Sequence, residues 1–165
     1  MRWVVLMLLA AGVALGAGLP EGQVQFAHDA WRASFTSTGS GPAVALSGGK
    51  EPATMAAGDY KLNQFTELGP ADAQGRRASL VMIASQPVTV AQGKVTAIAI
   101  GSPLKGAIVV SGQRPELKLS LALTDANGPA VALITKPDGQ KAPPPTLRVL
   151  DASGKEVYKA GMEYG

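Results

Sequence analysis

His28 and Asp29 are the residues of this chain whose types and spacing come closest to catalytic chemistry. A histidine beside a carboxylate suits general-base catalysis or metal binding. His28 is the only histidine, however, and no spacing in the chain joins it to the nucleophile that a catalytic triad needs. One imidazole alone also makes a poor metal site. We therefore expect His28 to lie in a loop or at a strand end, and we assign no catalytic and no metal-binding residue.

Two aspartate-containing segments, Asp125-Ala-Asn-Gly128 and Asp151-Ala-Ser-Gly154, share part of the pattern of calcium-binding loops. A calcium loop needs about six oxygen ligands, typically with a later bidentate glutamate at a fixed spacing. Glu156 follows Asp151 too closely for that spacing. We therefore predict that both segments are turns. The chain also lacks a glycine-rich phosphate loop before a helix, a GxSxG motif and an HExxH motif, so we expect neither an enzyme nor a cofactor.

Three aromatic residues, Trp31, Tyr158 and Tyr164, are the candidates for a ligand platform. Exposed aromatic rings stack on sugars, and buried ones anchor small cores. Trp31 has Phe26 and Phe35 close by in the sequence, which favours a place in the core. Both interpretations stay open at this point: a core anchor, or a carbohydrate platform that also uses the two tyrosines.

The N-terminal residues have the layout of a secretory signal peptide. Arg2 precedes an uncharged apolar run from Trp3 to Leu15, and small residues follow it. The run is shorter than the about 20 apolar residues that span a bilayer, and no later segment is long and apolar enough to span one. We predict cleavage after Gly16, or one residue later, and export to the periplasm or the medium. A retained membrane anchor is the alternative.

Charge and cysteine content exclude several functions. The chain has 15 basic and 12 acidic residues and no cysteine. Its basic residues form no cluster interleaved with aromatic ones, so we expect no nucleic-acid partner. Without cysteine the exported chain has no disulfide, no thiol nucleophile and no cysteine-based zinc site, and its core alone must hold the fold.

Alternating apolar residues indicate strands along the whole exported chain. The clearest run has leucine at 117, 119, 121 and 123, and a period of two places these side chains on one face of a strand. Turn segments that begin with aspartate and end with glycine separate such runs. The segment Asp151–Gly154 is predicted to join 146–150 and 155–159 as a hairpin. The pattern predicts an all-β, antiparallel β-sandwich.

Two segments also carry a resemblance to a known family: AAGDYKL at 56–62 and PVTVAQGKVTAI at 87–98. They resemble the closing strands of carboxypeptidase-regulatory-like, transthyretin-like and collagen-adhesin B-type domains. The resemblance covers residues 55–101 and implies an Ig-like or transthyretin-like sandwich. It implies that Gly58 permits a turn, that Tyr60 enters the core and that Gly93 turns a final hairpin.

The weak break at Gly101-Ser-Pro103 divides the expected domains. We expect a signal peptide over 1–16, a β-sandwich unit over 17–101 and a second small β unit over 102–165, or else one continuous sandwich over 17–165. A fold of this kind does not define a reaction. We expect a non-catalytic structural or interaction module of the cell envelope, whose partner is an envelope protein or a polysaccharide. A carbohydrate-binding module is the alternative, and an enzyme is a distant third.

Overall fold

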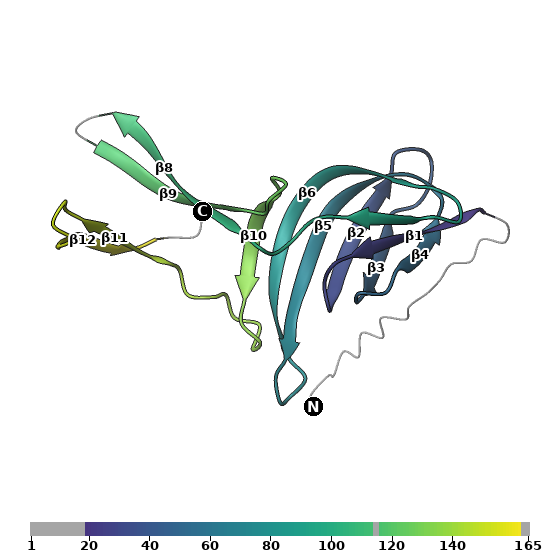
Figure 1. Ribbon diagram of the computed structural model, residues 1–165, viewed down its shortest axis with the longest axis horizontal. Coiled ribbons are helices and arrows are strands. Elements are labelled where there is room, and N and C mark those ends of the chain that lie inside the picture. The colour runs from purple at the N-terminus through teal and green to yellow at the C-terminus, as the bar shows by residue number, and fades with distance from the viewer. Residues whose placement is uncertain (1–18, 114–115, 163–165) are drawn as a thin grey trace, which may run out of the picture.

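The computed structural model describes residues 19–113 and 116–162, which form strands, turns and loops without any helix (Figure 1). The strands are β1 (Glu21–Phe26), β2 (Trp31–Ser37), β3 (Val44–Gly48), β4 (Ala53–Ala56), β5 (Gly58–Ala71), β6 (Arg77–Val90), β7 (Val95–Ile98), β8 (Lys105–Gln113), β9 (Glu116–Thr124), β10 (Ala130–Thr135), β11 (Thr146–Leu150) and β12 (Glu156–Gly161). Within the described ranges there is accordingly no helix that could cross a membrane. The leader predicted over 1–16 lies outside these ranges.

The strands form three sheets, and two of them pack face to face as a sandwich (Figure 1). A three-stranded sheet has the order β4-β1-β7, and a seven-stranded sheet has the order β3-β2-β5-β6-β10-β9-β8. The remaining sheet is the β11–β12 hairpin. All strand pairs are antiparallel except β1 with β7, which is parallel. The prediction of an all-β, antiparallel sandwich is confirmed.

The core lies between the small sheet and the β2, β5 and β6 part of the large one. Alternate residues of each strand point into it, because successive side chains of a strand leave opposite faces. Its largest fully buried side chains are Trp31, Phe26, Phe35, Phe65, Leu62, Met82, Val24 and Val90. The rings of Phe26 and Phe65 stack with centroids 4.9 Å apart. Apolar burial on this scale is the main favourable term in the folding of a chain without disulfides.

The segments that carry the family resemblance take part in this core. Tyr60 is buried, and its hydroxyl donates a hydrogen bond to the Ala56 carbonyl at 3.0 Å. Gly93 lies in the turn after β6, but the expected final hairpin does not form. Its N–H donates to the Glu21 carbonyl at 2.8 Å, which draws the chain toward β1. As a result β7 pairs in parallel with β1 in the other sheet and not with β6.

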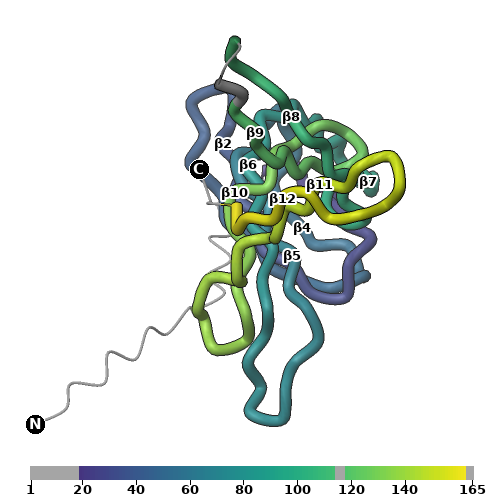
Figure 2. The backbone as a smooth tube through the Cα atoms, turned by 90° about the vertical axis from the view of Figure 1, so that its left-hand side faces the viewer, coloured from purple at the N-terminus to yellow at the C-terminus, as the bar shows by residue number. Residues whose placement is uncertain are grey.

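Two hairpins lie outside the sandwich, on the same side of the molecule (Figures 1 and 2). We call β8–β9 the arm and β11–β12 the terminal hairpin. The terminal hairpin has the predicted Asp151–Gly154 turn. On the arm, Leu119, Leu121 and Leu123 share one face, as their period predicts, but all three are only half-buried.

The seven-stranded sheet contains strands from both sides of the predicted boundary at 101–103. The link is β10, which returns from the arm and pairs with β6. The buried apolar core residues, in contrast, all precede residue 101. Among the described residues after 103, Leu104 and Val131 pack against the core, and both are half-buried. The seven-stranded sheet therefore crosses the predicted boundary, whereas the buried apolar core ends just before it.

Candidate functional site

His28 lies in the loop between β1 and β2, where it holds together distant parts of the chain. Its Nε2 lies 2.5 Å from the Ile100 carbonyl oxygen, and its Nδ1 lies 3.5 Å from Oε1 of Glu67 on β5. The expected place of His28 in a loop is confirmed. Asp29, the neighbour that the sequence suggested for orienting the imidazole, instead makes an ion pair with Lys50 at 2.7 Å.

Acidic side chains anchor residues 99–104, which we call the junction loop because they connect the sandwich to the arm. Glu67 Oε2 accepts a hydrogen bond from the Ser102 N–H at 2.9 Å. Asp125, which is buried, accepts from the Gly101 N–H at 3.2 Å and from the Asn127 N–H at 2.7 Å. Buried polar groups need such partners, since an unpaired one costs about 1–3 kcal/mol. This cluster of polar groups therefore fixes the connection between the core and the arm.

A surface cavity of about 430 Å³ lies beside His28, Glu67 and Lys50. Four of its ionisable groups form two pairs, His28 with Glu67 and Asp29 with Lys50. The Asp29–Lys50 ion pair lowers the pKa of Asp29, mainly through the hydrogen bond from Lys50, and raises the pKa of Lys50. Arg77 donates from Nη1 to the Gly69 carbonyl at 2.7 Å. Among the described residues that line the cavity, none is a serine, threonine or tyrosine whose hydroxyl His28 could activate.

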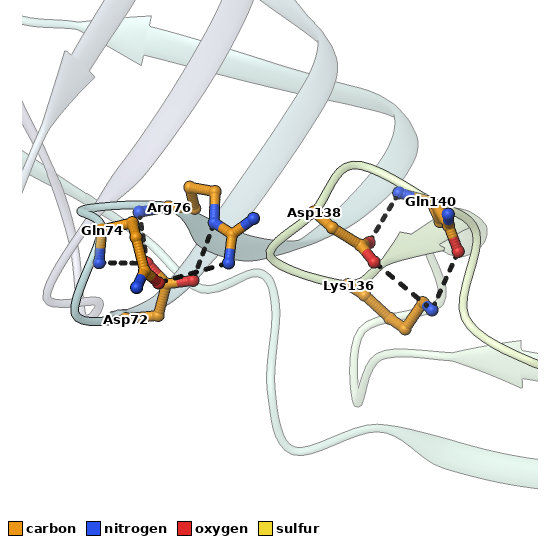
Figure 3. A network of polar contacts seen from close by, with 6 residues as sticks. All are labelled: Asp72, Gln74, Arg76, Lys136, Asp138 and Gln140. Carbon is orange, nitrogen blue, oxygen red and sulfur yellow. Dashed lines mark hydrogen bonds and ion pairs between the residues drawn. The ribbon is translucent and has the colours of Figure 1, made fainter.

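The aspartate segments are turns, as predicted. Figure 3 shows two of the turns close together, with Asp72 facing Arg76 in one and Asp138 facing Lys136 in the other. The carboxylate of Asp72 accepts from its own turn, at 2.8 Å from the Arg76 N–H. The Gln140 N–H bonded to Asp138 is the main cause of a lowered pKa of that carboxyl, and Arg76 adds to it. Over the described residues no cluster of three or more His, Asp or Glu side chains could hold a metal ion.

The aromatic candidates for a ligand platform lie in different environments. Trp31 is 1% exposed, donates from Nε1 to the Gly49 carbonyl at 2.7 Å and packs 4.4 Å from the ring of Phe26. It is a core anchor, and its interpretation as a carbohydrate platform is wrong because no ligand can reach the ring. Tyr158 on β12 is 55% exposed. Tyr164 lies outside the described residues.

Exposed apolar side chains gather on the arm and the terminal hairpin. On β8 they are Ile108, Val109 and Val110; on the terminal hairpin they are Val149, Leu150, Val157 and Tyr158. These two hairpins carry seven of the ten large apolar residues exposed in the described part of the chain. Contiguous apolar patches on a protein surface mark contact sites more often than isolated residues do.

The arm is the site that the sequence interpretation missed. Nothing in the run Gly106-Ala-Ile-Val-Val110 marks it as exposed, because short apolar runs are typical of sheet interiors. The structure makes β8 the last strand of the seven-stranded sheet, and all of its residues are exposed. Comparisons of the chain with family models, with curated proteins and with solved structures give no match.

Proposed function

We propose that this chain is an exported, non-catalytic interaction module of the cell envelope, periplasmic or secreted after removal of residues 1–16. The leader pattern supports export, and the resemblance of residues 55–101 to carboxypeptidase-regulatory-like domains supports an accessory role. The His28 cluster supports a structural role over a catalytic one, since its groups bind the Ile100 carbonyl and the Ser102 N–H of the junction loop. The partner is an envelope protein or a polysaccharide.

The observation that carries this proposal is the exposed apolar surface on the terminal hairpin. Val157 and Tyr158 are 58% and 55% exposed, and Val149 pairs with Tyr158 across the hairpin. Full burial of one such apolar side chain contributes about 1.5–3 kcal/mol of transfer free energy, and an exposed side chain lacks part of this stabilisation. A partner that covers this hairpin therefore gains affinity from surface that the chain's own core leaves uncovered.

Polysaccharide binding is the second candidate, and Tyr158 favours it. Its ring is exposed on β12, beside its cross-strand partner Val149 on β11. A ring of this kind stacks on the apolar face of a sugar. With Trp31 in the core, this platform has a single ring in the described part of the chain.

The test is retention of the purified protein on envelope fractions and on insoluble polysaccharides, including peptidoglycan. We compare it with Val157→Glu and with Val95→Glu, a matched control on β7 of the sandwich, where Val95 is 48% exposed. Loss of protein-dependent retention in Val157→Glu alone supports the interaction module. Retention that a soluble oligosaccharide competes away, and that Tyr158→Ala abolishes, supports the polysaccharide candidate. Absence of both kinds of retention refutes the proposal.

A further inference from the structure

β8 has no neighbour on its outer edge among the strands of residues 19–113 and 116–162. Every residue from Lys105 to Gln113 pairs with β9 on the other side. Alternate residues of such a strand direct their N–H and C=O groups to the open side, where they are ready to pair with another strand. Figure 1 shows β8 as the outer strand of the arm, away from the sandwich.

This edge lacks most of the features that normally block pairing; the exception is Gly112, near its end, whose φ of 97° departs from an extended strand. Natural edges are short, or carry proline or a charge within the strand. β3, the opposite edge of the sheet, has five residues, and β11 and β12 carry Arg148 and Lys159 within them. β9 carries Lys118 inside its strand. In β8 the only charge is Lys105 at its first position, and there is no proline.

The sequence of β8 is close to a palindrome about Val109, and a strand of this kind matches itself. Antiparallel pairing about that residue places Lys105 opposite Gln113, Gly106 opposite Gly112, Ala107 opposite Ser111 and Ile108 opposite Val110. Glycine therefore meets glycine, and branched side chains meet branched ones, which pack well across strands. We propose that β8 pairs with β8 of a second copy of this chain, across a two-fold axis at Val109. The inference rests on the proposed interaction function and names one partner for the arm.

Symmetry and charge favour this register. A two-fold axis that pairs antiparallel edges stands perpendicular to the sheet, so both copies present the same face on the same side. Pairing about Val109 uses all residues of β8, and a shift in either direction leaves strand ends unpaired. It also separates the two Lys105 side chains by about 27 Å along the strands, more than the Debye length of about 8 Å at physiological salt.

The pairing also gives the arm additional strands, which a two-stranded hairpin needs for stability. A two-stranded ribbon in water is marginally stable, and three or more strands with an apolar face are needed for independent stability. Joined arms form four strands, with Ile108, Val110, Leu119 and Leu121 of each copy on one side. The strands run in opposite directions, so the two sandwiches lie at opposite ends of the paired strands.

The first test is sedimentation equilibrium of protein purified after expression of the whole chain. We expect twice the mass of one chain, and a dimer at least about tenfold weaker in Val109→Lys, because two ammonium groups then face each other at the axis. A mixture of Val109→Lys with Val109→Glu restores the dimer. Val95→Lys, an equally exposed change on β7, leaves it intact. A single-chain mass at all concentrations, or a dimer that Val109→Lys does not weaken, overturns the proposal.

The second test reads the register and does not depend on the folding of a charged variant. The chain has no cysteine, so a single introduced one has no other partner. We expect Val109→Cys to form a disulfide-linked dimer on mild oxidation. Ile108→Cys alone does not, since its Cα atoms in the two copies lie about 8 Å apart, beyond disulfide reach. A mixture of Ile108→Cys and Val110→Cys does form a disulfide-linked dimer. Linkage of Ile108→Cys alone, as fast as that of Val109→Cys, overturns the register.

The proposed dimer and the proposed function can be refuted independently of each other. A protein that stays monomeric and is still retained by the envelope refutes the pairing of β8 and leaves the interaction module standing. A protein that dimerises and is retained on neither protein nor polysaccharide refutes the envelope role and leaves the pairing standing.

Discussion

Replacing Gly101 by alanine tests whether the His28 cluster holds the junction loop. Gly101 has a φ of 105°, and a Cβ atom there would lie 2.6 Å from His28 Nε2 and 3.0 Å from Glu67 Oε2. Gly128, in the turn after β9, has a φ of 106° and nothing within 4 Å of the same atom position. The two glycines therefore have nearly the same φ, and of the two only Gly101 is crowded.

The expected loss of stability follows from this difference. A residue other than glycine at positive φ costs about 1–2 kcal/mol, which both substitutions incur. At Gly101 the imidazole of His28 must also move, which breaks its contacts with the Ile100 carbonyl and with Glu67. The hydrogen bond to Ile100 and the contact with Glu67 contribute about 1 kcal/mol each. The sum is about 3–4 kcal/mol for Gly101→Ala and about 1–2 kcal/mol for Gly128→Ala.

The assay is urea unfolding at equilibrium, followed by fluorescence, together with the thermal midpoint. In a domain of this size 1 kcal/mol lowers the midpoint by about 2–4 °C, so the loss of about 3–4 kcal/mol in Gly101→Ala is expected to lower it by about 6–16 °C. Adding His28→Ala to Gly101→Ala relieves the crowding, so the double variant loses less stability than the sum of the single ones. Equal losses for Gly101→Ala and Gly128→Ala, within about 0.5 kcal/mol, would refute the reasoning.

Two further predictions concern the core and the turns. With the leader removed, Trp31 is the only tryptophan, so the fluorescence emission of the native protein is expected to be blue-shifted and resistant to quenching by acrylamide. Trp31→Ala is expected to lower the free energy of unfolding in urea by about 3–5 kcal/mol. Quenching of the native protein as strong as that of the urea-unfolded protein would contradict the burial of Trp31. The pKa of Asp151 lies below its ordinary 3.8, chiefly through the hydrogen bond from the Ser153 side chain, so Ser153→Ala is expected to raise it in an NMR titration of the carboxyl group. Because that pKa is depressed in the folded state, the ionised Asp151 carboxylate stabilises the fold fully above its ordinary pKa. This contribution is lost as the pH falls through the pKa of the folded state, so stability should decline in acid and not in base.

Local patterns were enough to predict the strands and the turns. Alternation with a period of two depends only on the geometry of an extended chain, and an aspartate that accepts hydrogen bonds from its own turn needs no distant partner. The Asp151–Gly154 hairpin and the shared face of Leu119, Leu121 and Leu123 are examples. The resemblance likewise placed Tyr60 in the core, since an aromatic residue on the inner face of a strand is a local feature.

Only the tertiary structure decided which strands pair and which side chains meet. A strand pattern specifies an extended segment but not its neighbour, so the sequence could not show that β7 would join β1 or that β8 would end the sheet. Glu67, and not the adjacent Asp29, faces His28 because β5 passes beside that loop. Trp31 had two interpretations until packing buried it, since the same ring anchors a core or stacks on a sugar. The sequence determined the elements through local geometry, and the free edge of β8 depends on contacts between segments that are distant in the chain.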